Sequence, residues 1–431
     1  MGDPAIADEH PGYHGHDVAP AQHREGRVAE AAGRMVGEEA LEIEDRAVCG
    51  ILDESVPRLR LTVLEWRYFQ HGGKIPKGIL ESKQARLNLL SWMLSAKGSS
   101  VANRLLNLIV IGAGSMGQNH LRLLSHSRLC NLVGVVESNE KARPGIAKAY
   151  RVPVLADLED ALATLEFDAA IIATPTETHY DMAKRLLDAG KHILAEKPFT
   201  EDPARGYELL ELSRAKGLVT LVGHVERFNP AVVLLQKKIH ELGDVYHIET
   251  ERTGPFPERI LSTGVALDLL VHDVDLILAL MGQGPAWTFA HRERRVHPRC
   301  EDGITALLGF DRDVIAVVKA NWLSPTKVRR FRIYGAKGMF EVDFLNRSLY
   351  FFENSFSAPV EDNYGLVGME EGNQIKFKTL PTEPLAAELE YFAGCITEGR
   401  LNEEMTRTNI RAIEIVSRIL ESAETNEKLK F

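Results

Sequence analysis

The sequence predicts an α/β protein: an N-terminal Rossmann domain with a doubly wound parallel sheet, followed by an α/β domain with a largely antiparallel open sheet. A glycine-rich turn follows a short apolar run at residues 106–111. Short apolar runs then alternate with helical patterns up to about residue 224. Beyond that point, longer runs alternate apolar and polar residues, which is typical of antiparallel strands with one solvated or subunit-facing side.

The composition is ordinary for a globular protein of two or three domains, with 431 residues, 45% hydrophobic and 26% charged. The formal net charge of −10 argues against nucleic acid as the main partner. No apolar run approaches the length needed to cross a bilayer, and no signal-peptide pattern opens the sequence. The four cysteines form no C-x-x-C pair, so we expect reduced thiols, a cytoplasmic location and no metal site.

Residues 1–103 carry no motif, and we expect a partly disordered N-terminal extension. Its first 46 residues or so are polar and acidic with little periodicity. The histidines there have neither cysteine neighbours nor regular helical spacing, which argues against a metal site. An amphipathic pattern between residues 56 and 92 predicts a small subdomain or one or two helices.

Residues 104–224 are predicted to form the Rossmann domain. We expect strands near 106–111, 132–137, 169–173, 192–195 and 218–222. Helices are expected near 115–127, 140–150, 157–165, 178–189 and 203–216. Short connections between these elements imply parallel strands joined by helices, and therefore a doubly wound sheet.

Residues 225–431 are predicted to form the second α/β domain. We expect strands near 245–253, 304–310, 314–322, 328–334, 339–344 and 348–352. Helices are expected from about residue 230 and near 384–398 and 406–424.

The glycine turn has the G-x-G-x-x-G spacing of a dinucleotide-binding loop. Gly112 allows the tight turn, Gly114 lets a pyrophosphate approach the backbone, and Gly117 lets the helix pack close to the strand. The phosphates would meet the free N–H groups of the helix that begins near Ser115 and Met116. Alone, this spacing is often only a glycine-rich turn, but here a strand precedes it and a helix follows.

Glu137 ends the second apolar run, 25 positions after Gly112. A carboxylate at this place accepts hydrogen bonds from the ribose hydroxyls and repels a 2′-phosphate, so it favours NAD over NADP. The alternative is a solvated glutamate in a loop. Lys141 and Arg143 lie close enough downstream to soften the preference, so NADP stays possible.

Two further strands end in polar residues, where open α/β sheets bind their ligands. Thr174 and Pro175 follow one strand, with His179 just beyond, and Glu196 and Lys197 end the next. Lys197 is well placed to reach a substrate hydroxyl. Burial and a nearby positive nicotinamide would favour its neutral form, which can accept a proton. The alternative is a surface lysine after a strand.

The segment 264–281 reads as a buried helix with three polar residues, Asp268, His272 and Asp275, at i, i+4 and i+7 on one face. Asp268 would hold the His272 imidazole in one tautomer, and histidine suits proton transfer near neutral pH. The alternatives are a structural polar network and a zinc site. Zinc is disfavoured because no third His or Cys ligand is nearby in sequence.

Together these motifs resemble the Gfo/Idh/MocA family of glucose-fructose oxidoreductases and inositol dehydrogenases. The glycine turn, Thr174-Pro175 with His179, the Ala195–Pro198 signature and the Asp268–His272 pair match that family in order over residues 104–431. The resemblance implies reversible oxidation of a sugar or cyclitol hydroxyl with NAD or NADP, in a homodimer or homotetramer. Residues 104–224 would then be the NAD-binding domain, and residues 225–431 the domain for substrate binding and oligomerisation. It assigns Lys197 as the family's lysine and His272 with Asp268 as its acid/base pair, and it adds Glu196 to the cofactor site.

A narrower resemblance, carried by residues 222–230 and 253–260, is to a branch that oxidises the 3-hydroxyl of UDP-N-acetylglucosamine or related UDP-sugars. Arg227 and Arg259 would bind the diphosphate, because guanidinium groups match its oxygens. Either arginine could instead be a structural salt-bridge partner. Asn229 would bond a sugar hydroxyl or cap the helix that begins at Pro230.

The sequence thus predicts NAD-dependent oxidation of a UDP-sugar to a 3-keto sugar. The first alternative is the same chemistry on a free sugar or cyclitol, favoured if Arg227 and Arg259 point away from the pocket. The second is a non-catalytic regulator that binds NAD and a ligand, against which the joint presence of Lys197, Asp268 and His272 argues.

Overall fold

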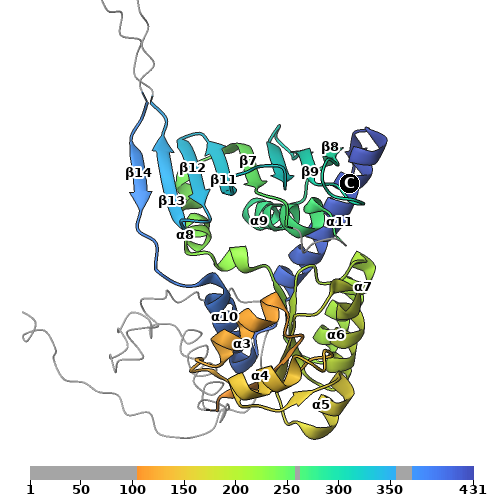
Figure 1. Cartoon of the computed structure of the whole chain (residues 1–431). Coiled ribbons are helices and arrows are strands. Elements are labelled where there is room, and N and C mark those ends of the chain that lie inside the picture. Colours follow the sequence, from red (N-terminus) through yellow and green to blue (C-terminus); the bar gives the residue numbers. More distant parts are fainter. Residues whose placement is uncertain (1–103, 258–262, 356–370) are drawn as a thin grey trace, which may run out of the picture. The chain divides into compact units, whose positions relative to one another are not determined.

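The computed structural model describes residues 104–257, 263–355 and 371–431 (Figure 1). The predicted N-terminal extension, residues 1–103, lies outside these ranges, as does the predicted diphosphate ligand Arg259. No helix within the described ranges is long and apolar enough to cross a membrane.

Six parallel strands form the first sheet, in the order β3-β2-β1-β4-β5-β6. The strands are β1 (Leu106–Ile111), β2 (Cys130–Val136), β3 (Val154–Leu155), β4 (Ala169–Ile172), β5 (His192–Glu196) and β6 (Thr220–Gly223). The direction of the strand order reverses between β1 and β4, so their carboxyl ends flank the crevice where such sheets bind ligands. This confirms the predicted doubly wound sheet, although β3, with two residues, is too short to show a pattern.

Five helices connect the strands of this sheet, and the side chain of an aspartate caps the start of two of them. They are α3 (Ser115–Leu124), α4 (Arg143–Tyr150), α5 (Leu158–Thr164), α6 (His179–Asp188) and α7 (Pro203–Ala215). The side chain of Asp157 caps α5 and that of Asp202 caps α7. By contrast, α3 has no side-chain cap and no acidic residue in its first turn. Its first N–H groups are therefore available to an anion.

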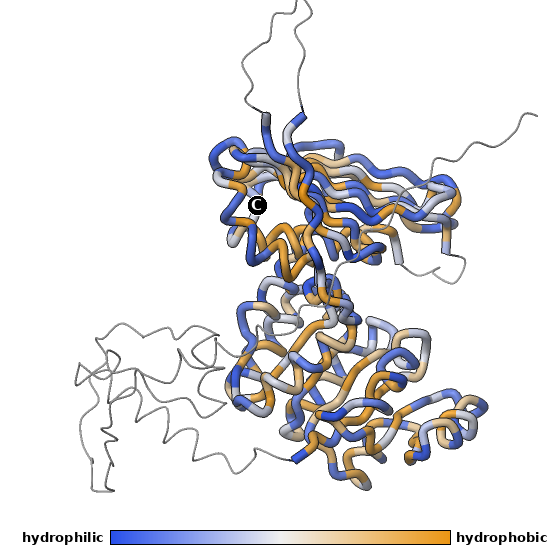
Figure 2. The backbone as a smooth tube through the Cα atoms, turned by 90° about the vertical axis from the view of Figure 1, so that its left-hand side faces the viewer, coloured by the Kyte–Doolittle hydropathy of each residue, from blue (hydrophilic) through white to orange (hydrophobic). Residues whose placement is uncertain are grey.

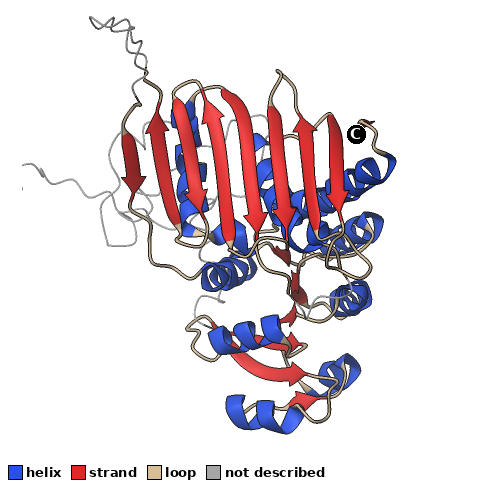
Figure 3. Cartoon of the chain, turned by 45° about the horizontal axis from the view of Figure 1, so that its top comes forward, coloured by secondary structure: helices blue, strands red, loops and turns tan. Residues whose placement is uncertain are grey.

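Nine strands form the second sheet, in the order β14-β13-β12-β11-β7-β10-β9-β8-β15 (Figure 3). Its strands are β7 (Val245–Thr253), β8 (Trp287–Glu293), β9 (Gly303–Gly309), β10 (Ile315–Asn321), β11 (Val328–Gly335), β12 (Gly338–Asp343), β13 (Ser348–Glu353), β14 (Gln374–Phe377) and β15 (Leu429–Lys430). Every pairing is antiparallel except that of β10 with β7. The largely antiparallel sheet is thus confirmed, while β8, β14 and β15 were not predicted.

Helices cover one face of this second sheet, as Figure 3 shows. They are α8 (Pro230–Lys238), α9 (Val271–Met281) and α11 (Glu403–Thr425). One π-helical turn, η5 (Ala266–Leu270), runs directly into α9. Hydrophobic and hydrophilic residues alternate along the strands (Figure 2), so one side of each strand joins the core beneath the helices.

The last helices also complete the first domain. In α10 (Pro384–Glu398), Leu389 and Phe392 belong to the same buried cluster as Leu108 of β1 and Leu121 of α3. Figure 1 shows α10 beside α3. The predicted boundary near residue 224 stays a prediction, but the core of the first domain includes residues that lie far beyond it.

Candidate active site

The glycine turn has the geometry that nucleotide binding requires. Gly112 has φ +87°, and a Cβ there would lie 2.6 Å from the carbonyl oxygen of Ala173. A Cβ on Gly117 would lie 1.9 Å from the carbonyl oxygen of Gly112. Around Gly114, by contrast, a Cβ would meet no described atom within 4 Å. Two glycines are therefore needed by the turn itself, and the middle one leaves open space over the start of α3, formed by Ser115 and Met116.

Glu137 is held directly beside this turn. Its Oε2 accepts a hydrogen bond from Ala113 N at 2.9 Å, and its Oε1 accepts one from Asn139 N at 2.7 Å. Each carboxylate oxygen keeps a further lone pair. The carboxylate is thus fixed in orientation at the end of β2, where the prediction places the ribose hydroxyls.

The ring of His179 bridges the two segments that follow β4 and β5. Its Nδ1 lies 3.0 Å from Pro198 O and its Nε2 lies 2.9 Å from Thr174 O, and the residue is buried. Since both ring nitrogens face backbone carbonyls, a direct contact with the cofactor is not what this geometry favours. His179 instead positions the Thr174-Pro175 turn and the segment after Lys197.

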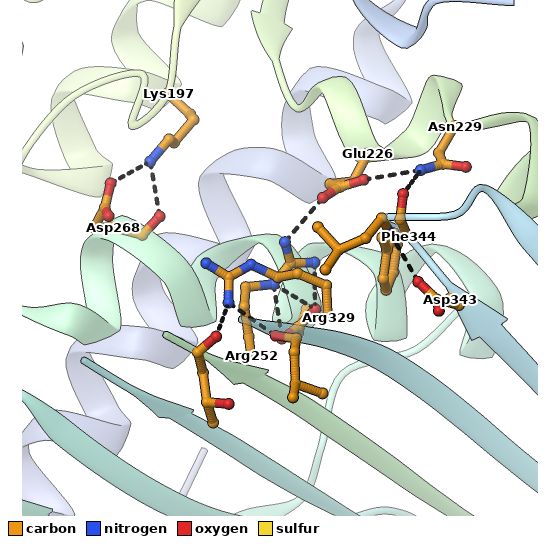
Figure 4. Close-up of polar contacts among 12 residues, drawn as sticks. Lys197, Glu226, Asn229, Arg252, Asp268, Arg329, Asp343 and Phe344 are labelled. Atoms are coloured by element: carbon orange, nitrogen blue, oxygen red, sulfur yellow. Dashed lines mark hydrogen bonds and ion pairs between the residues drawn. The ribbon is translucent and has the colours of Figure 1, made fainter. Parts of the chain in front are cut away.

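Lys197, which directly follows β5, and Asp268 of η5 contact each other (Figure 4). The Lys197 Nζ lies 2.9 Å from Asp268 Oδ1 and 2.8 Å from Asp268 O. Both side chains keep some exposure, 18% for the lysine and 24% for the aspartate. Lys197 therefore does not have the surface position of the alternative interpretation. The two acceptors fix the position of the Lys197 Nζ, and the exposed fraction of the side chain leaves it within reach of a ligand.

The predicted pairing of Asp268 with His272 is not present. Asp268 lies in the π-helical turn η5, and its carboxylate is directed to Lys197. A π-helix takes more residues per turn than an α-helix, so positions i and i+4 no longer align as the sequence spacing assumes. The third member of the predicted face, Asp275, instead binds Arg227.

His272 is nevertheless a base beside this pair. Burial, followed by the charge of Lys197, lowers the pKa of His272 well below its usual value of 6.5. Its Nδ1 is buried and meets no hydrogen-bond partner among the described residues. The imidazole is therefore neutral at physiological pH, and one of its two ring nitrogens can accept a proton.

The sequence reasoning missed His224. This buried residue directly follows β6, and its ring packs edge-on against His272 with centroids 5.7 Å apart. Burial lowers the pKa of His224 to about 4, so it is neutral as well. Its position was the available signal, because it follows the strand next to β5, whose end carries Lys197.

Arg227 is a structural salt-bridge partner and Asn229 is a helix cap, which are the alternatives to their predicted contacts with the substrate. The guanidinium of Arg227 donates to both carboxylate oxygens of Asp275 at 2.6 Å. Arg227 also borders a hollow of about 1000 Å³ whose lining includes neither Lys197 nor His272. Asn229 is buried and caps α8 by accepting from Ala231 N. Neither residue is placed to bind substrate beside Lys197.

A buried ion-pair network lies beneath the site and was not predicted. Arg252 of β7 donates to Asp273 at 2.8 Å. It also donates to Glu226 at 2.9 Å (Figure 4). These carboxylates raise the pKa of Arg252 against the opposing effect of burial. The structural polar network weighed for the 264–281 helix therefore exists, but Asp273 and Asp275 form it.

Glu196 faces inward from the end of β5. Its Oε1 lies 2.8 Å from Nε2 of the buried His120 on α3, and the glutamate itself is buried. The predicted cofactor contact of Glu196 would thus act through the orientation of α3.

Within the described ranges, no group of three or more His, Cys, Asp and Glu residues could hold a metal ion.

Glu388 of α10 lies fully buried near Glu196, and its two carboxylate oxygens meet no hydrogen-bond partner within the described ranges. Burial, and then the charge of Glu196, raise the pKa of Glu388 well above its usual 4.5. The folded protein therefore keeps a proton that the unfolded chain releases above pH 4.5. Stability from this group is present below that pH and is lost as the pH rises towards the folded pKa.

We expect Glu388→Gln to raise the free energy of unfolding at pH 7.5 by on the order of 1–3 kcal/mol, because an amide needs no proton uptake on folding. Urea unfolding at pH 5.0 and 7.5 measures this, and the gain should shrink at the lower pH. Glu390→Gln, an exposed neighbour on the same helix, is the matched control. Equal pH dependence in the two variants would contradict a protonated Glu388.

Comparison with protein families gives two adjoining matches. Residues 106–224 match the model of an oxidoreductase family with an NAD-binding Rossmann fold, GFO_IDH_MocA. Residues 237–341 match the GFO/IDH/MocA C-terminal domain. The two matches coincide with the first sheet and with most of the second.

Individual relatives give the same picture. The chain is 31% identical to a UDP-N-acetylglucosamine 3-dehydrogenase of Acidithiobacillus ferrooxidans over 291 residues, which is 68% of this chain and 88% of that protein. It is 30% identical to an inositol 2-dehydrogenase of Rhizobium meliloti, over 41% of this chain and 55% of that one. A crystal form of the Acidithiobacillus enzyme superposes with a TM-score of 0.66 at 27% identity, covering 75% of this chain and 99% of that one.

Proposed function

Because the chain belongs to the Gfo/Idh/MocA family of oxidoreductases, with an NAD-binding Rossmann domain, we propose that it oxidises the 3-hydroxyl of UDP-N-acetylglucosamine or a closely related UDP-sugar. The product would be the 3-keto sugar. The observation that carries the chemistry is the ammonium of Lys197, fixed by Asp268 at the crevice beside the neutral imidazole of His272.

In this mechanism His272 removes the hydroxyl proton, because it is the neutral base at the site. Lys197 donates a hydrogen bond to the same hydroxyl oxygen and stabilises the negative charge that develops there. Asp268 holds the ammonium in place through its carboxylate and its carbonyl oxygen. NAD⁺, when bound, supplies the acceptor for the hydride that leaves the sugar carbon.

The chain's own residues fit the cofactor. The open space at Gly114 and the uncapped start of α3 suit a pyrophosphate, and the fixed carboxylate of Glu137 suits ribose hydroxyls. Since that carboxylate would repel a 2′-phosphate, we propose NAD as the preferred cofactor over NADP.

Similarity to the UDP-N-acetylglucosamine dehydrogenase along nearly its whole length supports the nucleotide sugar. The inositol dehydrogenase match spans about half of that relative. A free sugar or cyclitol is nevertheless the second candidate substrate, because Arg227 is engaged by Asp275. The face of the second sheet that the described helices leave uncovered would serve assembly into a homodimer or homotetramer.

The test is NADH formation by the full-length protein with UDP-N-acetylglucosamine, glucose or myo-inositol. We expect kcat/KM for the UDP-sugar to exceed the others by roughly 100-fold or more, because extra polar contacts give large discrimination. Parallel assays add 2-oxoglutarate, since a retained NADH would need a co-substrate to reoxidise it. If only inositol is oxidised, inositol replaces the UDP-sugar as the proposed substrate. If none of the three compounds is oxidised, a non-catalytic binding protein is favoured.

A further inference from the structure

Two arginines stand opposite each other on neighbouring strands of the second sheet. Arg329 on β11 pairs in register with Arg252 on β7. Both project towards the helix-covered side, the side on which the alternate residues Phe331 and Ile248 are buried. Like charges directly opposite each other repel, so each guanidinium requires compensation.

The two arginines are compensated very differently. Arg252 is buried and bound by the carboxylates of Asp273 and Glu226. Arg329 has no carboxylate within ion-pair distance among the described residues. One of its terminal nitrogens, Nη1, donates to the carbonyl oxygens of Thr253 at 2.7 Å and Val328 at 2.9 Å. Its Nε and its other terminal nitrogen meet no acceptor within the described ranges.

Arg329 is thus a half-buried cation with unused donors. Burial, and then the charge of Arg252, lower the pKa of Arg329 to about 10. An anion placed against these donors would supply the missing counter-charge and match the fork of the guanidinium.

This cation lies close enough to the predicted catalytic residues to act on them electrostatically. Its charge, like that of Lys197, contributes to lowering the pKa of His272, and the charge of Asp268 acts on Arg329 in turn. Figure 4 shows Lys197, Asp268, Arg252 and Arg329 in one close-up. An anion at Arg329 would therefore belong to the same substrate whose hydroxyl meets Lys197.

We propose that Arg329 binds the diphosphate of the nucleotide-sugar substrate and so sets the preference for a UDP-sugar over a neutral sugar. This inference rests on the proposed function, and it assigns the substrate specificity of the proposed reaction to one residue, Arg329. A carboxylate on the sugar ring would offer the same oxyanion chemistry, and the experiment separates the two.

The experiment titrates UDP into the full-length protein saturated with NAD⁺, by calorimetry, for the wild type, Arg329→Gln and Arg330→Gln. Arg330 is the matched control because it is the next residue of β11 and is exposed on the other side of the sheet. We expect the Kd for UDP to rise roughly 10- to 100-fold in Arg329→Gln and to stay unchanged in Arg330→Gln. Glucuronate, the carboxylate probe, should bind the wild type at least 10-fold more weakly than UDP.

Kinetics and folding controls complete the test. KM for UDP-N-acetylglucosamine should rise with the Kd for UDP while kcat changes little, and Arg329→Lys should restore part of the affinity. Equal thermal melting of the variants shows that Arg329→Gln is folded, and Arg329→Lys supplies the comparison if it is not. Unchanged UDP affinity in both Arg329 variants overturns the proposal, as does a wild type that binds glucuronate but not UDP.

Failure of the inference and failure of the proposed function give different results. If the wild type binds UDP through Arg329 but oxidises no UDP-sugar, the result supports the anion site and contradicts the proposed reaction. If UDP-N-acetylglucosamine is oxidised equally well by wild type and Arg329→Gln, the reaction stands and the assignment of Arg329 falls.

Discussion

Replacing Lys197 with methionine should lower kcat for sugar oxidation by about 10³-fold or more, while the affinity for NADH stays within about twofold. Methionine keeps the length of the stem but removes the ammonium that Asp268 aims at the crevice. Stopped-time assays of the keto product and fluorescence titration with NADH measure the two quantities. Lys184→Met, on the exposed side of α6, is the control for loss of a lysine.

The same variant tests how Lys197 acts on His272. The positive charge of Lys197 helps to hold the pKa of His272 below its usual value. Without that charge the pKa of His272 should rise, and the acid limb of the residual kcat/KM profile should move to higher pH. Full turnover in Lys197→Met would remove this lysine from the mechanism.

Alanine at Gly117 should lower both the stability of the fold and the affinity for the cofactor, whereas alanine at Gly114 should lower only the affinity for the cofactor. Gly117→Ala places a Cβ 1.9 Å from the carbonyl oxygen of Gly112, so α3 must shift from β1. We expect a loss of about 2–4 kcal/mol in the free energy of unfolding and no measurable NAD binding. Gly114→Ala meets no described atom within 4 Å, so its stability should be unchanged.

The loss in Gly114→Ala should be confined to NAD affinity, by roughly tenfold or more, because the methyl group fills the space that a pyrophosphate needs. Thermal melting and calorimetric titration with NAD⁺ separate the two effects. Gly145→Ala, which also meets no described atom within 4 Å but lies in α4, should leave NAD affinity unchanged and raise stability by at most about 1 kcal/mol, because alanine favours the helix. NAD binding by Gly114→Ala at wild-type strength would show that the phosphates do not approach this turn.

The parts of the molecule that sequence reasoning predicts well are those with a strong local signature. The glycine turn, the buried parallel strands and the alternating antiparallel strands each follow from spacing and period alone. Short elements such as β3 and β15 have too few residues to show a period. They exist because neighbouring strands offer free backbone hydrogen bonds, which no local pattern records.

The site was harder to predict because its pairings are tertiary. The π-helical turn redirects Asp268 from His272 to Lys197, and a spacing rule that assumes 3.6 residues per turn cannot detect it. Arg227 has the same chemistry whether it binds a phosphate or the buried Asp275. For His224, the only signal in the sequence was its position directly after a predicted strand. Which of several polar residues face one another depends on how distant segments meet.

The cluster that joins α10 to β1 and α3 also bears on how the chain is made. Leu389 and Phe392 complete a core whose members in the first sheet and its helices, Leu106 to Leu221, are synthesised about 170 to 290 residues earlier. During translation, the nucleotide-binding half therefore emerges with an apolar flank that stays uncovered until the final helices arrive. The core of the first half is completed only when α10 is made, so a gene fragment that ends after β14 would encode an unfinished first half.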